Sequence, residues 1–350
     1  MKYYLKEEFL HDNNAKNAGN KARNDVESIV KSQGFQALIL SVDNWYEMST
    51  AKAQIHKAKA FSHSLNRLNE GDELLIQFPM LHHSFFTTSL VKKARRRGVK
   101  IYFIIHDLDA LRFMNGQAVP LKHRIRMKIQ ESGLLGSSDG IIAHNPIMKS
   151  VLVDKGIAAD KIVSLDIFDY LIPNFQEKTG LTKNQRIIVA GNLAQEKASY
   201  LYSLPAEPAY NLYGVGFDEN RALANETYFG PFLPDELPAA LEGGFGLVWD
   251  GDSAETCSGG FGEYLRYNNS HKASLYLASG FPLVVWKQSA LSHFVLENGC
   301  GIAVESLHDL KATIDNLSDT DYQDLVENTK RVGKGIRDGH YLLTALNNLK

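Results

Sequence analysis

The sequence has few cysteines and no long apolar segment. Cys257 and Cys300 are too few for a disulfide framework or a cysteine-based zinc site, and two thiols fit a reducing compartment. Serine, glycine and proline interrupt the most apolar stretch, 275–286, whereas a bilayer span needs about 20 apolar residues. The N-terminus shows no basic region followed by an apolar run. These absences predict a cytoplasmic protein with no membrane span.

The sequence also carries almost no net charge. Its 38 Lys and Arg residues nearly balance 40 Asp and Glu residues, so no global field favours nucleic acid or an anionic membrane. The basic run 92–97 ends directly before Gly98, where cations stabilise the C-terminal end of a helix dipole. Nucleic-acid binding is therefore not predicted, and any bound anion must be held by a local site.

Three common nucleotide-binding and hydrolase motifs are missing. The chain has no Walker A sequence and no G-x-S-x-G nucleophile elbow. The turn 17–20 (NAGN) contains Gly19, which would let the backbone approach a ligand closely. This turn lacks the G-x-G-x-x-G spacing, so dinucleotide binding is poorly supported.

Short apolar runs alternate with amphipathic stretches along the chain, as in a parallel sheet covered by helices on both faces. The pattern predicts an α/β, doubly wound fold. The expected strands are 3–5, 37–40, 73–77, 100–105, 140–143, 186–190, 211–213, 245–249, 282–286 and 301–304; the expected helices are 21–32, 51–68, 85–97, 121–131, one from 146 onward, 271–278, 319–332 and 339–349. The predicted domains are an N-terminal Rossmann-like domain (1–170), a linker (171–185), a C-terminal Rossmann-like domain (186–336) and a C-terminal helix (337–350) that packs back on the first domain. Two such domains would face each other across a cleft at the carboxyl ends of their strands.

The segment 267–286 contains the most informative helix start. Asn269 or Ser270 is a suitable N-cap, which places His271 and Lys272 in the first turn. A cation there opposes the helix dipole, and a bound anion, held by free N–H groups and Lys272 together, would explain it. The alternative is a Lys272 that simply faces solvent.

Two D-x-D pairs follow apolar strands. Asp250 and Asp252 follow 245–249, and His106 precedes the pair Asp107 and Asp109. Such carboxylates could hold Mg²⁺ or Mn²⁺ beside a diphosphate, bind sugar hydroxyls or abstract a proton. A ligand-free turn and a helix N-cap are the respective alternatives.

Several motifs together resemble the bacterial glucosyltransferase 3 group, which is similar to β-1,6-galactofuranosyltransferases. They are NAGN (17–20), IIHDLDALR (104–112), AGNL (190–193), YFGPF (228–232), GFGLVWDGDS (244–253) and YNNSHKASLYLASGFPLVVW (267–286). The resemblance implies two facing domains of the GT-B fold, a UDP-sugar donor bound mainly to the C-terminal domain, and no metal or other cofactor. It also implies a homo-oligomer and, as acceptor, a GlcNAc-bearing glycoprotein, the serine-rich adhesin of streptococcal and lactobacillal members.

The resemblance also implies roles for individual residues. The UDP contacts carried over by position are Asn17, Lys197, Tyr228, Asn268, Asn269, Ser270, His271 and Lys272. Lys197 stands where some relatives have Arg, which exchanges a bidentate contact for a point charge. In a metal-free site, Asp250 and Asp252 would bind donor hydroxyls or shape the turn.

The first hypothesis is therefore an inverting transferase that moves glucose or GlcNAc from a UDP-sugar to a GlcNAc-modified glycoprotein. Asp107 is the expected general base, with Asp109 and His106 as the next candidates. The second hypothesis is a galactofuranosyl- or other hexosyltransferase of polysaccharide synthesis. The third is a catalytically silent partner subunit, against which the retained Lys272 and the carboxylates argue.

Overall fold

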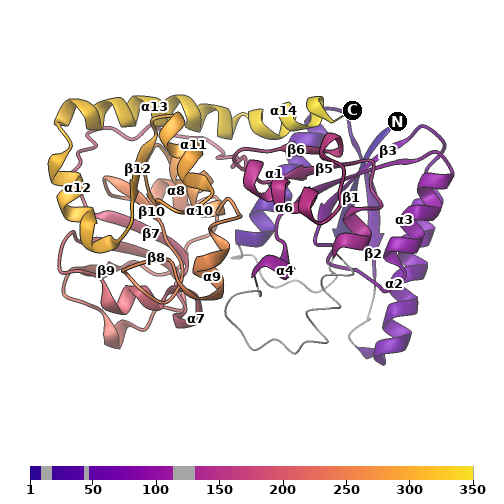
Figure 1. Ribbon diagram of the computed structural model, residues 1–350, viewed down its shortest axis with the longest axis horizontal. Coiled ribbons are helices and arrows are strands. Elements are labelled where there is room, and N and C mark those ends of the chain that lie inside the picture. The colour runs from indigo at the N-terminus through magenta and orange to yellow at the C-terminus, as the bar shows by residue number, and fades with distance from the viewer. Residues whose placement is uncertain (9–17, 43–46, 113–130, 350) are drawn as a thin grey trace.

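The computed structural model describes residues 1–8, 18–42, 47–112 and 131–349. Two separate six-stranded parallel sheets, each flanked by helices, lie side by side along the long axis of the molecule (Figure 1). The first half contains β1 (Lys2–Glu8), α1 (Ala18–Ser32), β2 (Gln36–Ser41), α2 (Thr50–Leu65), β3 (Glu73–Phe78), α3 (Thr87–Arg96), β4 (Lys100–Ile105), α4 (Asp109–Arg112), β5 (Gly140–Ala143), α6 (Pro146–Asp154) and β6 (Ile162–Ser164). The second half contains β7 (Ile187–Asn192), α7 (Gln195–Ala198), β8 (Tyr210–Val215), β9 (Glu226–Tyr228), α8 (Leu237–Ala240), β10 (Phe245–Val248), α9 (Gly259–Tyr264), α10 (His271–Ser279), β11 (Leu283–Trp286), α11 (Leu291–Glu297), β12 (Gly301–Val304), α12 (Leu310–Asn316), α13 (Asp319–Arg337) and α14 (His340–Asn348).

Both sheets are buried on both faces, which confirms the doubly wound α/β prediction. The strand orders are β2-β1-β3-β4-β5-β6 and β12-β11-β10-β7-β8-β9. Successive residues enter opposite cores: in β4, Phe103 packs into one hydrophobic cluster and Ile104 into another. In β7, Ile187 packs into one hydrophobic cluster of the second half and Ile188 into another. Such strands must be apolar at every position, and this continuous hydrophobicity made them recognisable in the sequence.

The predicted strands are present, and the sequence pattern missed two others. β6 and β9 are three-residue strands at sheet edges, too short to produce a recognisable periodicity. The predicted helix 121–131 lies outside the described residues except for Glu131, which is helical. Residues 165–186, all described, form no helix or strand and connect the two sheets.

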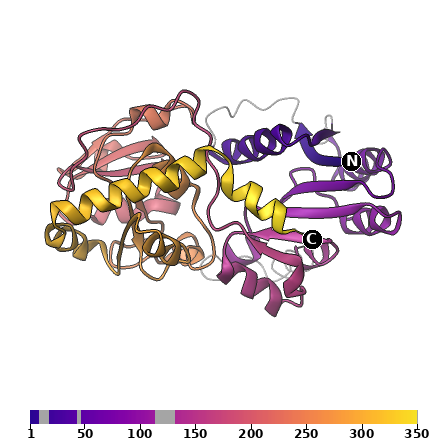
Figure 2. The same cartoon turned by 90° about the horizontal axis from the view of Figure 1, so that it is seen from above.

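The last two helices join the halves. α13 lies along the second half, and α14 continues onto the first, as Figures 1 and 2 show. The carboxylate of Asp169 accepts hydrogen bonds from the backbone N–H groups of Tyr341 (3.2 Å) and Leu342 (2.7 Å) at the start of α14. Leu342 is buried in the same cluster as Tyr4 and Val26 of the first half. In the described residues, no helix is long and apolar enough to cross a bilayer.

Candidate functional site

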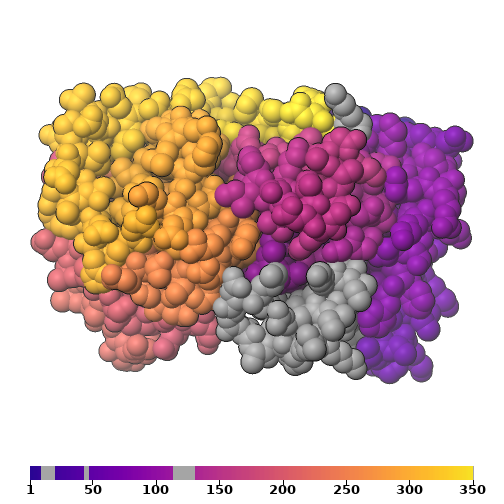
Figure 3. Space-filling view, viewed as in Figure 1, coloured from indigo at the N-terminus to yellow at the C-terminus, as the bar shows by residue number. Residues whose placement is uncertain are grey.

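The carboxyl end of β4 lies against the second half. The N–H of Leu108 donates to the hydroxyl of Tyr264 in α9 at 2.9 Å, and the Arg112 guanidinium lies 5.3 Å from the Tyr264 ring centre. Tyr264 is 3% exposed and packs into the hydrophobic core of the first half. Figure 3 shows the two halves packed directly against each other. The D-x-D pair after β4 therefore lies beside the interface between the halves.

Asn269 also connects the two halves, and both polar atoms of its side chain form hydrogen bonds with residues of the first half. Its Oδ1 accepts a hydrogen bond from Asn145 (2.8 Å), and its Nδ2 donates to the carbonyls of His144 (2.9 Å) and Asp166 (2.7 Å). Its backbone N–H donates to Nδ1 of His144 (3.0 Å). A buried amide with this many partners has little capacity left for a ligand. We therefore leave Asn269 out of the UDP contacts proposed below.

Replacing Asn269 by alanine is expected to lower the free energy of unfolding by about 3 kcal/mol. The substitution removes three side-chain hydrogen bonds and leaves buried polar groups of the first half unsatisfied. Asn268→Ala is the matched control, because the buried Oδ1 of Asn268 has no hydrogen-bond partner among the described residues. Urea unfolding of both variants measures the difference. Equal midpoints for the two would show that Asn269 does not hold the halves together.

The start of α10 places a buried cation at the carboxyl edge of the second sheet. Of the two predicted N-cap candidates, Asn269 and Ser270, Ser270 is the N-cap, and its Oγ accepts a 3.4 Å hydrogen bond from the N–H of Lys272. The Lys272 ammonium does not face solvent freely: it donates to the carbonyl of Trp249 (2.8 Å) and to Oδ1 of Asp250 (2.7 Å). Burial lowers the pKa of Lys272, and Asp250 opposes that shift.

A second lysine approaches the same carboxylate. Nζ of Lys197 in α7 lies 3.9 Å from Oδ2 of Asp250 and 5.6 Å from the ring centre of Phe261. One carboxylate thus lies between two ammonium groups, which leaves one positive charge in excess. Gly191, near the end of β7, borders the space around the two lysines, because a Cβ added at this position would lie 3.8 Å from the Lys272 side chain.

Three histidines surround Phe168 on the first-half side of α10. The Phe168 ring stacks on His271 (centroids 4.5 Å apart) and on His106 (5.5 Å), and His144 meets it edge-on at 4.8 Å. Burial lowers the pKa of His271 to about 4 and that of His144 to about 3. Neither ring nitrogen of His271 has a hydrogen-bond partner among the described residues. His271 is therefore a neutral ring with unused polar atoms at the start of α10.

Asp107 and Asp109 share one arginine. Nη2 of Arg112 donates to Oδ1 of Asp107 at 2.7 Å, and Nη1 lies 3.8 Å from Oδ1 of Asp109. Burial raises the pKa of Asp107 despite the neighbouring Arg112. Burial lowers the pKa of His106 well below its ordinary value, and its Nε2 pairs with Oε1 of Gln77 at 2.8 Å. Nε2 of His106 is therefore engaged with Gln77, and Asp107 remains the candidate base.

Comparison with known proteins identifies the family. Residues 2–167 match the family described as "Glucosyltransferase 3-like, N-terminal domain", and residues 187–349 match "Glucosyltransferase 3-like, C-terminal domain". The chain belongs to the glucosyltransferase 3-like family. It is 34% identical over 346 residues to the β-1,6-galactofuranosyltransferase WbbI of Escherichia coli, covering 97% of this chain and 96% of the relative. It is 25% identical to glucosyltransferase 3 of Streptococcus gordonii, covering 91% of this chain and 90% of the relative.

Solved structures confirm the fold expected from the resemblance. Sucrose-phosphate synthase of Thermosynechococcus elongatus superposes with a TM-score of 0.66 at 11% identity, covering 99% of this chain and 96% of that protein. HepE of Anabaena, in complex with UDP and glucose, superposes with a TM-score of 0.55 at 12% identity, covering 99% of each chain. The protein is a glycosyltransferase of the GT-B fold.

The remaining predicted site residues of the glycosyltransferase are less closely grouped. The hydroxyl of Tyr228 donates to the carbonyl of Gly214 (2.7 Å), and β8 pairs Gly214 with Gly191. Tyr228 thus belongs to the same sheet edge as Lys272. Asp252 is exposed and lies against Gly259, where an added Cβ would be 2.2 Å from its Oδ2. Gly19 lies in the first turn of α1, and Asn17 lies outside the described residues.

Several residues near the domain junction of the glycosyltransferase were not predicted from the sequence. These are Arg112, His144, Asn145, Phe168, Phe261 and Tyr264, together with Glu131, whose pKa burial raises to about 7. The dipeptide His144-Asn145 offered a signal, because it follows β5 just as His106-Asp107 follows β4. Arg112, Phe168, Phe261 and Tyr264 make contacts between the two halves, which leave no local pattern in the sequence, and Glu131 accepts a hydrogen bond from the N–H of Ala110 within the first half. Within the described residues, no group of three or more His, Cys, Asp or Glu side chains is placed to hold a metal ion.

Proposed function

We propose that the protein transfers a hexosyl group from a UDP-sugar to a hydroxyl of an acceptor sugar, with inversion at the anomeric carbon. The observation that carries this proposal is the cationic group at the start of α10, with Lys272 and Lys197 around Asp250. It lies on the second sheet, and Asp107 extends from the first sheet at the same domain junction. HepE, which shares the fold, was solved with UDP and glucose.

The diphosphate site consists of the α10 N-terminus and the two lysines. The first N–H groups of a helix attract anions, and two ammonium groups near one carboxylate leave a net positive charge for a diphosphate. His271 adds ring nitrogens that have no described protein partner. The Tyr228 end of the same sheet edge would accommodate the nucleoside, and the exposed Asp252 would bind a donor hydroxyl or shape its loop.

The transfer is a single displacement. The acceptor oxygen forms a bond to the anomeric carbon while the bond to the UDP oxygen breaks, and that electron pair leaves with UDP. Lys272, Lys197 and the helix N–H groups stabilise the charge that develops on the leaving group. Asp107 takes the proton of the acceptor hydroxyl, and its raised pKa makes it a better proton acceptor than an exposed aspartate. No metal is required in this scheme.

The acceptor is the finer part of the proposal. The relative from Streptococcus gordonii is named glucosyltransferase 3, which supports glucose as the transferred sugar. GlcNAc as the alternative sugar and a GlcNAc-modified serine-rich glycoprotein as the acceptor rest on the sequence resemblance alone. A second candidate, galactofuranosyl transfer to a polysaccharide, is favoured by the 34% identity to the E. coli galactofuranosyltransferase. Domain limits, cytoplasmic location and assembly into a homo-oligomer remain predictions from the sequence.

Titration calorimetry with UDP, followed by a hydrolysis screen of UDP-sugars, tests the donor. We expect UDP to bind with micromolar affinity and one UDP-hexose to be hydrolysed slowly without acceptor, because a preorganised leaving-group site also assists attack by water. UDP-glucose, UDP-GlcNAc, UDP-galactopyranose and UDP-galactofuranose separate the two candidates. Absence of UDP binding would rule out the proposed donor site.

A further inference from the structure

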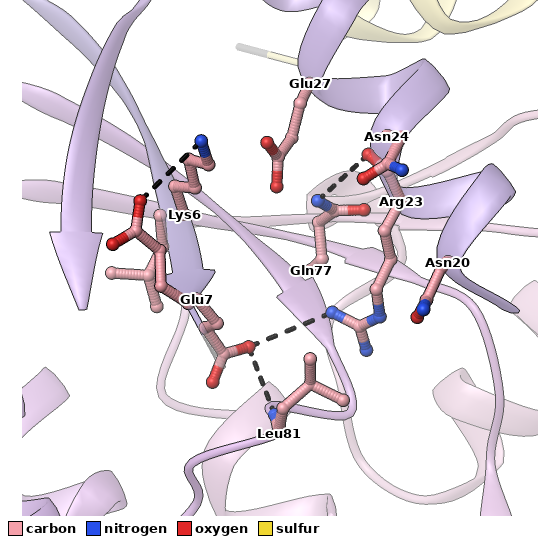
Figure 4. Close-up of a pocket in the computed structure, with 10 residues that line it drawn as sticks. Lys6, Glu7, Asn20, Arg23, Asn24, Glu27, Gln77 and Leu81 are labelled. Carbon is pink, nitrogen blue, oxygen red and sulfur yellow. Dashed lines mark hydrogen bonds and ion pairs between the residues drawn. The ribbon is translucent and has the colours of Figure 1, made fainter. Parts of the chain in front are cut away.

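A polar pocket of about 390 Å³ lies in the first half, between the end of β1 and the face of α1 (Figure 4). Its walls come from four elements or turns: β1, α1, β3 and the segment after β3. The lining residues are Leu5, Lys6, Glu7, Glu8, Asn20, Arg23, Asn24, Glu27, Gln77 and Leu81. A volume of this size accommodates a small ligand such as one or two sugar rings.

Sheet order places this pocket beside the proposed base. β1, β3 and β4 are neighbours, so their carboxyl ends lie next to one another. The Gln77 side chain connects the two regions: Nε2 donates to the carbonyl of Arg23 (3.4 Å), and Oε1 pairs with Nε2 of His106 (2.8 Å). Asp107 is the next residue after His106. A ligand in the pocket could therefore present a group toward Asp107.

The charges of the lining disfavour a nucleotide. Three carboxylates, from Glu7, Glu8 and Glu27, outnumber the cations of Lys6 and Arg23. A diphosphate would be repelled here, whereas the second half carries the excess positive charge. Amides, carboxylates and cations provide donors and acceptors around one space, which matches a neutral ligand with many hydroxyl groups.

The carboxylates of Glu7 and Glu27 differ in whether they are available to bind a ligand. Glu7 is committed to the protein, because its oxygens accept from the N–H groups of Leu81 (3.1 Å) and His82 (2.7 Å). Glu27 extends from α1 toward the strands, as Figure 4 shows. Within the part of the chain that the structure describes, its carboxylate has no hydrogen bond or ion pair, and burial raises its pKa. The charges of Lys6 and Arg23 act on this carboxylate and oppose the shift, but neither forms an ion pair with it among the described residues.

We propose that this pocket binds the acceptor sugar, and that the Glu27 carboxylate accepts a hydrogen bond from one of its hydroxyl groups. The inference rests on the proposed function, because the bound sugar directs its reacting hydroxyl to Asp107. Arg23 and Gln77 also line the pocket and contribute further polar groups to it. Glu27 is a specificity-determining residue and takes no proton in the reaction.

The test compares Glu27→Gln with the wild-type protein. Saturation-transfer NMR first measures the binding of methyl β-glycosides of glucose, galactose and GlcNAc without nucleotide, a readout that does not depend on the donor site. The best-bound glycoside then serves as acceptor with the preferred UDP-sugar. We expect Glu27→Gln to weaken glycoside binding and raise the acceptor KM by about tenfold, because the amide oxygen of Gln accepts a weaker hydrogen bond than the charged carboxylate does. UDP binding and donor hydrolysis are expected to stay unchanged.

Ser28→Ala is the matched control, because Ser28 follows Glu27 on α1, is exposed and hydrogen-bonds only to the carbonyl of Asn24 among the described residues. Thermal melting confirms that both variants are folded. An unchanged glycoside affinity in Glu27→Gln overturns the proposal, and so does a wild-type protein to which none of the glycosides binds. Loss of UDP binding in the wild type would instead count against the donor site, leaving the NMR result to decide the acceptor pocket.

Discussion

Replacing Lys272 by alanine is expected to weaken UDP binding by about 2 kcal/mol, roughly thirtyfold, and to reduce transfer further. The ammonium group lies at the start of α10 beside Asp250, and a diphosphate there would receive one charge-assisted hydrogen bond from it. The loss of rate should exceed the loss of affinity, because negative charge on UDP is greatest as the sugar leaves. Calorimetry measures the affinity, and released UDP measures the rate.

Lys272→Ala also removes the nearer of the two cations beside the Asp250 carboxylate and leaves only Lys197 there, so two further variants are needed to separate the effects. Asp250→Asn keeps the Lys272 ammonium and removes the neighbouring negative charge, so UDP should bind at least as tightly as in the wild type. In Lys272→Ala/Asp250→Asn, no carboxylate repels the diphosphate, and any loss of affinity that remains belongs to the ammonium group. Wild-type affinity in the double variant would place the diphosphate elsewhere.

The part of this site that follows local rules could be predicted from the sequence. Asn269 and Ser270 were both recognised as N-cap candidates because capping depends on adjacent residues, and the structure shows that Ser270 is the N-cap. The ion pair between Lys272 and Asp250 could not be predicted. It spans 22 residues and forms because β10 lies between β7 and β11, an order that strand periodicity does not determine.

The contacts at the domain junction could not be predicted from the sequence either. Asn269 was expected at the nucleotide because it lies in the segment shared with relatives, yet its side chain binds His144, Asn145 and Asp166 of the first half. Sequence proximity to Lys272 could not distinguish these roles, since neighbouring residues at a helix start point in different directions. The two sheets, in contrast, followed from hydrophobicity alone, because strands buried on both faces admit few polar residues.

Replacing Asp107 by asparagine is expected to reduce kcat by about 10²–10⁴-fold and to leave UDP affinity nearly unchanged. Asparagine has similar shape but cannot take the proton of the acceptor hydroxyl. Asp109→Asn is the matched control, because Asp109 lies 3.8 Å from the same Arg112 and is more exposed. Single-turnover transfer measurements with saturating donor separate this loss of chemistry from weakened binding.

The pH dependence provides an independent check on the same residue. A general base must be deprotonated, so the rate should fall as pH decreases through the pKa of Asp107. Burial raises that pKa, which places the acidic limb of kcat/KM above the ordinary aspartate value of about 3.9. In Asp107→Asn this limb should disappear, whereas Asp109→Asn should retain it. If Asp107→Asn kept both the limb and the rate, another group would have to take the proton, and Glu131, whose pKa burial raises to about 7, would be the next residue to replace.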